Sequence, residues 1–157
     1  MLGQIKRLVL SVLFILYVPC VMALGVDELL AENARPEGVV FEVVSKDPAL
    51  LQVLLPRLQD DINRLRRHYP GLPLAVVSHG REQFALLSKD DGKKEGLHEL
   101  VRQMVKQQGV EVHVCGTYAE RYGYLPEDFP EYVDVSAEGP AQINDYRELG
   151  YRVVRYR

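Results

Sequence analysis

The stretch VEVHVCGTYAE at residues 110–120 decides the predicted fold, because it places a strand directly before a helix. Valine fills every second position of its first half, and β-branched residues in alternation are typical of a strand. Thr117 and Glu120 have the spacing of a capping box, which predicts that a helix starts at Thr117. The strand therefore ends at Cys115, and a helix begins two residues later.

The same alternation of strand and helix extends in both directions from this stretch. Strands are predicted at residues 39–44, 74–78, 110–114, 132–135 and 151–156. Helices are predicted at residues 48–68, 97–105, from 117 and 140–149, and residues 83–87 fit either a short helix or a strand. Pro56 lies inside the first of these helices and predicts a kink or a later start. Strands that alternate with helices indicate an α/β fold, with a parallel sheet covered on both faces.

The composition fits one globular domain and excludes several function classes. The chain has 157 residues, of which 47% are hydrophobic, enough for a single core. A formal net charge of −3 gives no basic excess, so no nucleic-acid partner is expected. Two cysteines exclude a disulfide scaffold. Motifs for dinucleotide binding, a P-loop or a hydrolase elbow are missing, and no cofactor is expected.

Residues 1–23 are predicted to be a targeting segment. Lys6 and Arg7 precede an apolar run at residues 8–18, and small residues follow up to Ala23. This is the pattern of a secretory signal peptide that is cut after Ala23. An uncleaved membrane anchor is the main alternative, because the run approaches the length of a spanning helix. The predicted location is therefore periplasmic or secreted, with a membrane contact only if the segment stays attached.

Cleavage after Gly25 and lipid attachment at Cys20 are the remaining alternatives for the leader.

Removal of the leader changes the charge and the cysteine content of the chain that remains. Residues 24–37 are then a polar lead-in, and residues 38–157 form one domain. Two positive charges and one cysteine leave with the leader, so the mature chain is more acidic and Cys115 is its single cysteine. Such a thiol is buried and inert, paired between chains, or free for a chemical task.

The position of Cys115 favours the chemical task. Ligands and reacting groups of parallel sheets gather beyond the carboxyl ends of the strands, where Cys115 lies. The positive end of the helix expected at Thr117 would favour the thiolate, which is the nucleophilic form. Gly116 leaves space for a ligand to approach the backbone. The alternative is a small buried side chain at a strand end.

Two histidines are candidates to assist the thiol. His113 is two residues before Cys115 and points to the same side of the strand, together with Glu111. That face is more polar than a central strand requires, so we expect it to be left uncovered by this chain's own helices. His79 ends the second strand and would lie near Cys115 if the two strands are neighbours. Cys115, His113 and His79 could also bind copper or zinc, but no metal-binding spacing occurs, so no metal site is predicted.

The sequence resembles the DsrE/DsrF-like family of small sulfur-relay proteins from about residue 39 to 155. The resemblance rests on the strand–helix order, on VEVHVCG at residues 110–116, and on the closing DYRELGYRVVR at residues 145–155. In that family the cysteine that ends this strand can receive sulfur as a persulfide, and Cys115 is the matching position. The resemblance implies a three-layer α/β/α sandwich with a mainly parallel five-stranded sheet. It also implies assembly into trimers or hexamers.

Three functional hypotheses follow. The first is an exported DsrE-like protein, a sulfurtransferase-like carrier that binds or relays sulfur through Cys115. Its partners would be a sulfur donor or acceptor protein, or a small sulfur compound, with His79, His113, Gly116 and Thr117 in support. The second is a non-catalytic, oligomeric module of the same fold that binds a ligand or a protein. The third, and least favoured, is a periplasmic metal-binding protein.

Overall fold

The structure is a computed structural model that describes residues 25–32, 34–90 and 92–157. The predicted signal peptide at residues 1–23 lies outside the described residues. The strands are β1 (Gly38–Val43), β2 (Leu74–Ser78), β3 (Val110–Cys115), β4 (Asp134–Ser136) and β5 (Tyr151–Tyr156). The α-helices are α1 (Val26–Ala31), α2 (Leu50–His68), α3 (Glu95–Lys106), α4 (Gly116–Glu120) and α5 (Gly139–Glu148). Three short 3-10 helices are η1 (Arg81–Leu86), η2 (Ser88–Asp90) and η3 (Pro126–Asp128).

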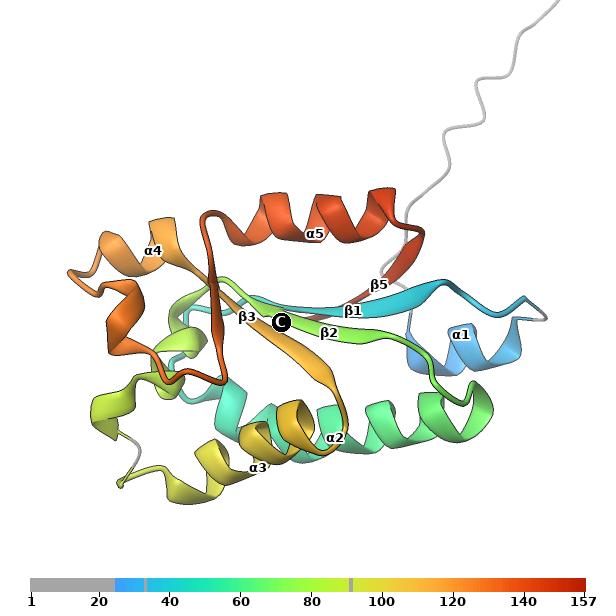
Figure 1. The fold of residues 1–157 in the computed structure, drawn as a ribbon, viewed down its shortest axis with the longest axis horizontal. Coiled ribbons are helices and arrows are strands. Elements are labelled where there is room, and N and C mark those ends of the chain that lie inside the picture. Colours follow the sequence, from blue (N-terminus) through green and yellow to red (C-terminus); the bar gives the residue numbers. More distant parts are fainter. Residues whose placement is uncertain (1–24, 33, 91) are drawn as a thin grey trace, which may run out of the picture.

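The strands form one five-stranded sheet in the order β4-β3-β2-β1-β5, and every pairing is parallel. Helices α2 and α3 lie on one face and α5 lies on the other, so the molecule has three layers (Figure 1). The short helix α4 lies beyond the carboxyl end of β3 (Figure 1). The predicted α/β/α fold with a parallel five-stranded sheet is confirmed.

The two faces of the sheet bury different amounts of apolar surface. The larger core lies on the side of α2 and α3, where leucines at helical spacing along α2 meet the strands. The smaller core lies under α5 and consists of Val40, Ala75, Val77, Ile143 and Tyr146. Both β1 and β2 are buried along their whole length, as expected for central parallel strands. Polar side chains on the α5 face must therefore find partners within the fold.

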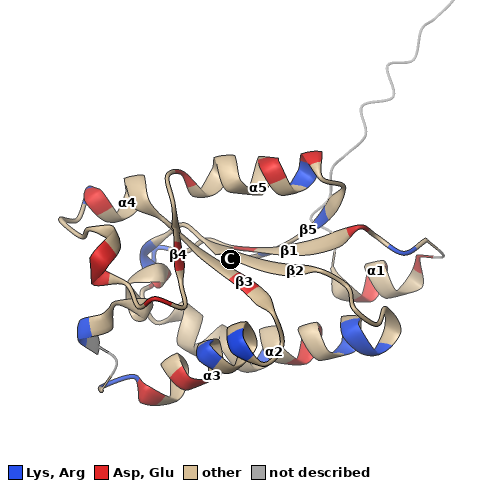
Figure 2. Cartoon of the chain, viewed as in Figure 1, with Lys and Arg blue, Asp and Glu red and all other residues tan. Residues whose placement is uncertain are grey.

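Helix α2 is the longest helix, and it contains Pro56 without ending there. It starts at Leu50 rather than Pro48, because the Asp47 side chain and carbonyl accept hydrogen bonds from Ala49 and Leu50 and close a turn first. The helix ends with the basic residues Arg66 and Arg67 in its last turn (Figure 2). Positive charge there complements the helix dipole.

The capping box expected at Thr117 does not form. Helix α4 begins one residue earlier, and the Thr117 hydroxyl donates to the carbonyl of Ala137 at 2.7 Å instead of capping the helix. The Thr117 amide donates to the same carbonyl at 3.0 Å. Thr117 therefore ties α4 to the segment that follows β4, and this long-range contact replaces the local one that the spacing suggested.

Residues 24–37 were expected to be a polar lead-in, but part of this segment belongs to the packed domain. Residues 26–31 form α1, and Val26 and Leu29 are buried in the larger core against α2. The Tyr69 hydroxyl donates to the Leu29 carbonyl, and Arg64 pairs with Asp27. The folded domain therefore begins near residue 26 rather than at 38.

Within residues 25–32, 34–90 and 92–157, no helix is long and apolar enough to cross a membrane.

Candidate functional site

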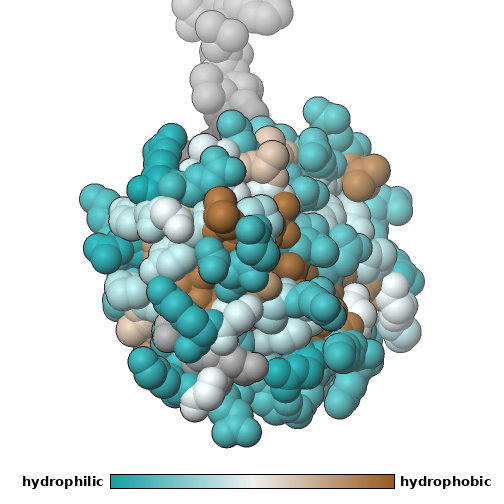
Figure 3. Space-filling model, turned by 60° about the vertical axis from the view of Figure 1, so that its left-hand side comes forward, coloured by the Kyte–Doolittle hydropathy of each residue, from teal (hydrophilic) through white to brown (hydrophobic). Residues whose placement is uncertain are grey.

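Cys115 lies at the carboxyl end of the sheet, beside a pocket of about 260 Å³. The pocket is lined by His79, Cys115, Thr117, Tyr118, Arg121, Glu138 and Pro140. These residues come from the ends of β2 and β3, from α4 and from the start of α5, so the pocket forms where four segments meet. Figure 3 shows the side of the molecule that carries α4, where a mainly hydrophilic surface is interrupted by separate hydrophobic areas.

Gly139 brings His79 and Cys115 together. A Cβ atom on Gly139 would lie 2.5 Å from the Cβ of His79 and 3.3 Å from the Cβ of Cys115. No side chain fits at such distances, so the first residue of α5 has to be a glycine. Since β2 and β3 are neighbours, the structure places His79 and Cys115 at the same pocket.

The main chain around Cys115 is held by a residue that the sequence analysis did not single out. The Cys115 amide donates to the Gln83 side-chain oxygen at 2.8 Å, and Gln83 is fully buried. The Gln83 side-chain nitrogen has no hydrogen-bond partner among the described residues. Cys115 itself is 5% exposed, so its thiol meets solvent only through the pocket.

Gly116 and Thr117 have supporting positions, but they differ from those expected. A Cβ on Gly116 would lie 3.1 Å from the carbonyl oxygen of Ser136, so this glycine permits close packing of α4 against β4. The Thr117 amide is already bonded to Ala137 and is not available to a thiolate. The Thr117 amide itself is therefore not the group that would stabilise a thiolate, although the residue lines the pocket.

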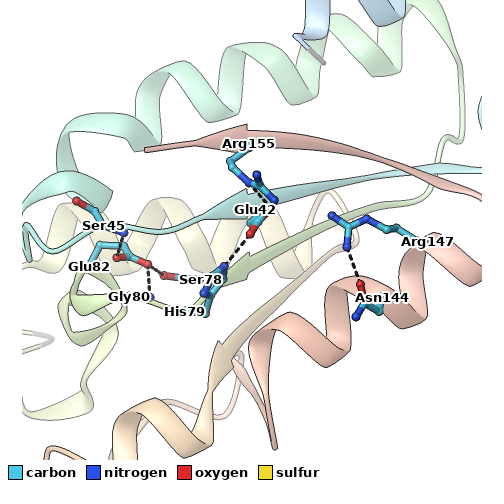
Figure 4. Close-up of polar contacts among 9 residues, drawn as sticks. All are labelled: Glu42, Ser45, Ser78, His79, Gly80, Glu82, Asn144, Arg147 and Arg155. Atoms are coloured by element: carbon cyan, nitrogen blue, oxygen red, sulfur yellow. Dashed lines mark hydrogen bonds and ion pairs between the residues drawn. The ribbon is translucent and has the colours of Figure 1, made fainter. Parts of the chain in front are cut away.

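His79 is connected to two charged residues on neighbouring strands (Figure 4). Its Nε2 atom lies 3.0 Å from Oε1 of Glu42, and the other oxygen of Glu42 accepts from Nε of Arg155 at 2.5 Å. Burial raises the pKa of Glu42, but the hydrogen bonds from His79 and Arg155 outweigh burial and leave the pKa below its ordinary value. Glu42 is therefore a carboxylate near neutral pH, although it is buried.

A second buried carboxylate shapes the loops around the pocket (Figure 4). Glu82 is fully buried and accepts hydrogen bonds from the amides of Ser45 and Gly80 and from the hydroxyl of Ser78. It therefore joins the loop after β1 to the end of β2, directly beside His79. A side chain on Gly80 would collide with the Ser45 backbone at 2.3 Å, so the two loops lie in close contact.

His113 does not line the pocket. Its Nε2 lies 2.8 Å from the hydroxyl of Tyr146, and its Nδ1 lies 3.1 Å from the hydroxyl of Ser136. Tyr146 in turn donates to Glu111 at 2.7 Å. Burial and the bond to Glu111 raise the pKa of Tyr146, so its hydroxyl keeps its proton.

The expectation that this polar face of β3 is uncovered is wrong at His113, although Glu111 on the same face is exposed. His113 is 8% exposed, and Tyr146 of α5 contacts its ring. His113 can be buried because both of its ring nitrogens have hydroxyl partners. His113 therefore has contacts that suit a structural role under α5, while His79 is the histidine at the pocket.

In the part of the chain that the structure describes, no group of three or more His, Cys, Asp or Glu side chains could hold a metal ion. The chemistry available at the pocket is that of one thiol, one imidazole and several charged side chains. Arg121 adds a positive charge and Glu138 a negative one.

Comparison with known proteins places the chain among relatives of the same fold. Residues 57–156 match the model of the DsrE/DsrF-like family. Among solved structures, the protein of unknown function MTH1491 from Methanobacterium thermoautotrophicum is similar, with 22% identity and a TM-score of 0.57 over 75% of this chain and 97% of that one. The ychN protein from E. coli is similar with 18% identity and a TM-score of 0.55, over 76% of this chain and 99% of that one.

The comparison with curated proteins gives no match. The two solved structures support the fold alone, because their sequence identity to this chain is low. The family match covers more than half of the chain and includes both His79 and Cys115. It confirms the resemblance seen in the sequence: the chain belongs to the DsrE/DsrF-like family.

Proposed function

We propose that this protein carries sulfane sulfur as a persulfide on Cys115. The observation that supports it best is the pocket, which gives the thiol at the end of β3 about 260 Å³ of space beside a histidine and an arginine. Cys115 is otherwise buried, so a reagent that enters this pocket meets the sulfur while bulk solvent is largely kept away. Membership of a sulfur-relay family adds to this support.

The chemistry requires only a thiolate and a donor with a sulfur–sulfur bond. With thiosulfate, the Cys115 thiolate attacks the outer sulfur atom, and a new sulfur–sulfur bond forms as the old one breaks. Sulfite leaves with the bonding electron pair, and Cys115 remains as a persulfide. A second thiol would later take up the outer sulfur and return Cys115 to its starting form. Arg121 at the pocket suits an anionic donor.

The test is to incubate the reduced full chain with thiosulfate or with polysulfide, trap it with an alkylating reagent and map the peptides by mass. The expected result is one added sulfur atom on the peptide that holds Cys115, which is distinct from the peptide that holds Cys20. Cys115→Ser removes the added mass from that peptide. The proposal fails if neither donor adds sulfur to a Cys115 that the same reagent alkylates readily.

Export and assembly into trimers or hexamers stay predictions of the sequence. Export would place the thiol in an oxidising compartment, where small sulfur compounds are the simplest donors to reach it. Size measurement by light scattering on the purified protein tests the assembly directly.

A further inference from the structure

Three side chains from adjacent strands form a hydrogen-bonded row that ends at the Cys115 pocket: Arg155, Glu42 and His79. Arg155 on β5 stands opposite Glu42 on β1 in the register of the sheet, and His79 follows the end of β2. The His79 amide donates to the carbonyl of Val43, which fixes the main chain of the histidine next to β1. The side chains then continue the row from Arg155 through Glu42 to His79 (Figure 4).

The contact with Glu42 determines which ring nitrogen of His79 carries the proton. An ionised carboxylate accepts hydrogen bonds and cannot donate one, so the 3.0 Å contact requires a proton on Nε2. In the neutral ring, Nδ1 is then the atom with the lone pair. No described residue hydrogen-bonds to Nδ1. His79 thus combines a fixed tautomer with an Nδ1 lone pair, and its side chain lines the same pocket as Cys115.

We propose that Glu42 is a positioning residue, which holds His79 so that its Nδ1 atom accepts the proton of the Cys115 thiol. This inference rests on the proposed function, in which Cys115 is the reacting group. In the step, the sulfur–hydrogen bond breaks, the electron pair stays on sulfur, and the proton passes to Nδ1. The Glu42 carboxylate compensates the charge of the imidazolium that forms, and Arg155 holds the carboxylate from its other side.

Other titratable and charged groups face the same region. Arg121, Glu138 and Tyr118 line the pocket, and Glu82 binds the amide of the residue after His79. Arg147 on α5 donates to Asn144 (Figure 4). All of them are retained when Glu42 is replaced, so their contribution is common to the parent protein and the variant.

The test measures the rate at which iodoacetamide alkylates Cys115 between about pH 5 and 10, read from the mass of its peptide. Glu42→Gln keeps the shape of the side chain and removes its charge. We expect the rate near neutral pH to fall about tenfold or more, because the thiolate–imidazolium pair loses its counter-charge. At high pH the thiol ionises without help, and the rate is expected to equal that of the parent protein.

A histidine variant and a double variant separate this role from a merely structural one. His79→Gln should reproduce the loss near neutral pH, and the double variant with Glu42→Gln should be no slower than His79→Gln alone. Glu99→Gln, which changes an exposed carboxylate on α3, should leave the profile unchanged. A uniform loss at every pH, or an additive double variant, would overturn the proposal.

Nitrogen NMR of the parent protein provides a measurement that does not depend on how any variant folds. The expected signal is a proton on Nε2 of His79, in the neutral ring as in the imidazolium, and a neutral ring with its proton on Nδ1 instead would refute the assignment. Neither measurement uses a sulfur donor. Failure of persulfide formation and failure of the Glu42 role are therefore distinguishable.

Discussion

At the scale of single residues, loss of the Glu82 side chain should destabilise the loops beside the pocket. This side chain is fully buried and accepts from two backbone amides and one hydroxyl, which belong to Ser45, Gly80 and Ser78. Glu82→Ala leaves these donors without partners inside the fold. We expect the free energy of unfolding to fall by about 3 kcal/mol, measured by urea denaturation.

Two further variants show whether this loss comes from the missing acceptors. Glu82→Gln keeps one acceptor oxygen and should fall between the parent protein and Glu82→Ala. Glu99→Ala removes an exposed carboxylate from α3 and should change the free energy by about 0.5 kcal/mol or less. Equal stability of Glu82→Ala and Glu99→Ala would contradict the role given to Glu82.

The residues that sequence reasoning found and missed differ in the kind of signal they give. Cys115 and His79 end predicted strands, and the rule for parallel sheets predicts that such positions lie together. Glu42 gives a weaker signal, as one acid within a β-branched strand that should be buried, where a charge needs a partner. Gln83 accepts from the Cys115 amide and Glu82 from the Ser45 amide, which are distant in the sequence. No local spacing in the sequence indicates such contacts.

At the scale of elements, helical periodicity predicted the long helices well, while their ends depended on contacts between distant segments. Helix α4 starts at Gly116 rather than Thr117, and Thr117 bonds to Ala137, a residue twenty positions later. Strand β4 covers Asp134–Ser136 rather than residues 132–135, because these three residues are the ones that pair with β3. The order of the strands was not readable from the sequence, because it depends on which side each helix crosses.

Pro56 offers a test of how much α2 depends on tertiary packing. It lies in the interior of the helix on an exposed face, and it cannot donate the backbone hydrogen bond to the carbonyl of Gln52. Pro56→Ala restores that donor, while it also makes the unfolded chain more flexible. We expect the free energy of unfolding to rise by about 1–2 kcal/mol in urea denaturation.

The matched control for Pro56 is Gln52→Ala, one turn earlier on the exposed surface of α2. It should change the free energy of unfolding by about 0.5 kcal/mol or less, because neither a buried contact nor a backbone bond is altered. A loss of stability in Pro56→Ala would show that the surrounding structure requires the proline geometry.

At the scale of the whole molecule, the two ends of the described chain are joined through α1. Arg152 on β5 pairs with Glu32, and Leu29 is fully buried against α2. The N-terminal segment therefore belongs to the same packed unit as the last strand. Leu29→Ala should cost about 2–4 kcal/mol by creating a cavity, whereas a detached lead-in would tolerate it without loss.

Gly25, the residue before α1, distinguishes the two predicted forms of the mature chain. The Gly25 amide donates to Glu28 at 2.7 Å, and the Gly25 carbonyl accepts from Leu29. A chain that starts at Leu24 keeps both bonds. A chain that starts at Val26 loses them and places a positive α-ammonium group at the positive end of the helix dipole. We expect the longer form to be more stable by about 1 kcal/mol in urea denaturation. The predicted cleavage after Ala23 has its own test, in which the mass of the N-terminal peptide of the mature chain should give Leu24 as the first residue. Equal stability of the two forms would contradict the first expectation, and a mature chain that begins at Val26 would contradict the second.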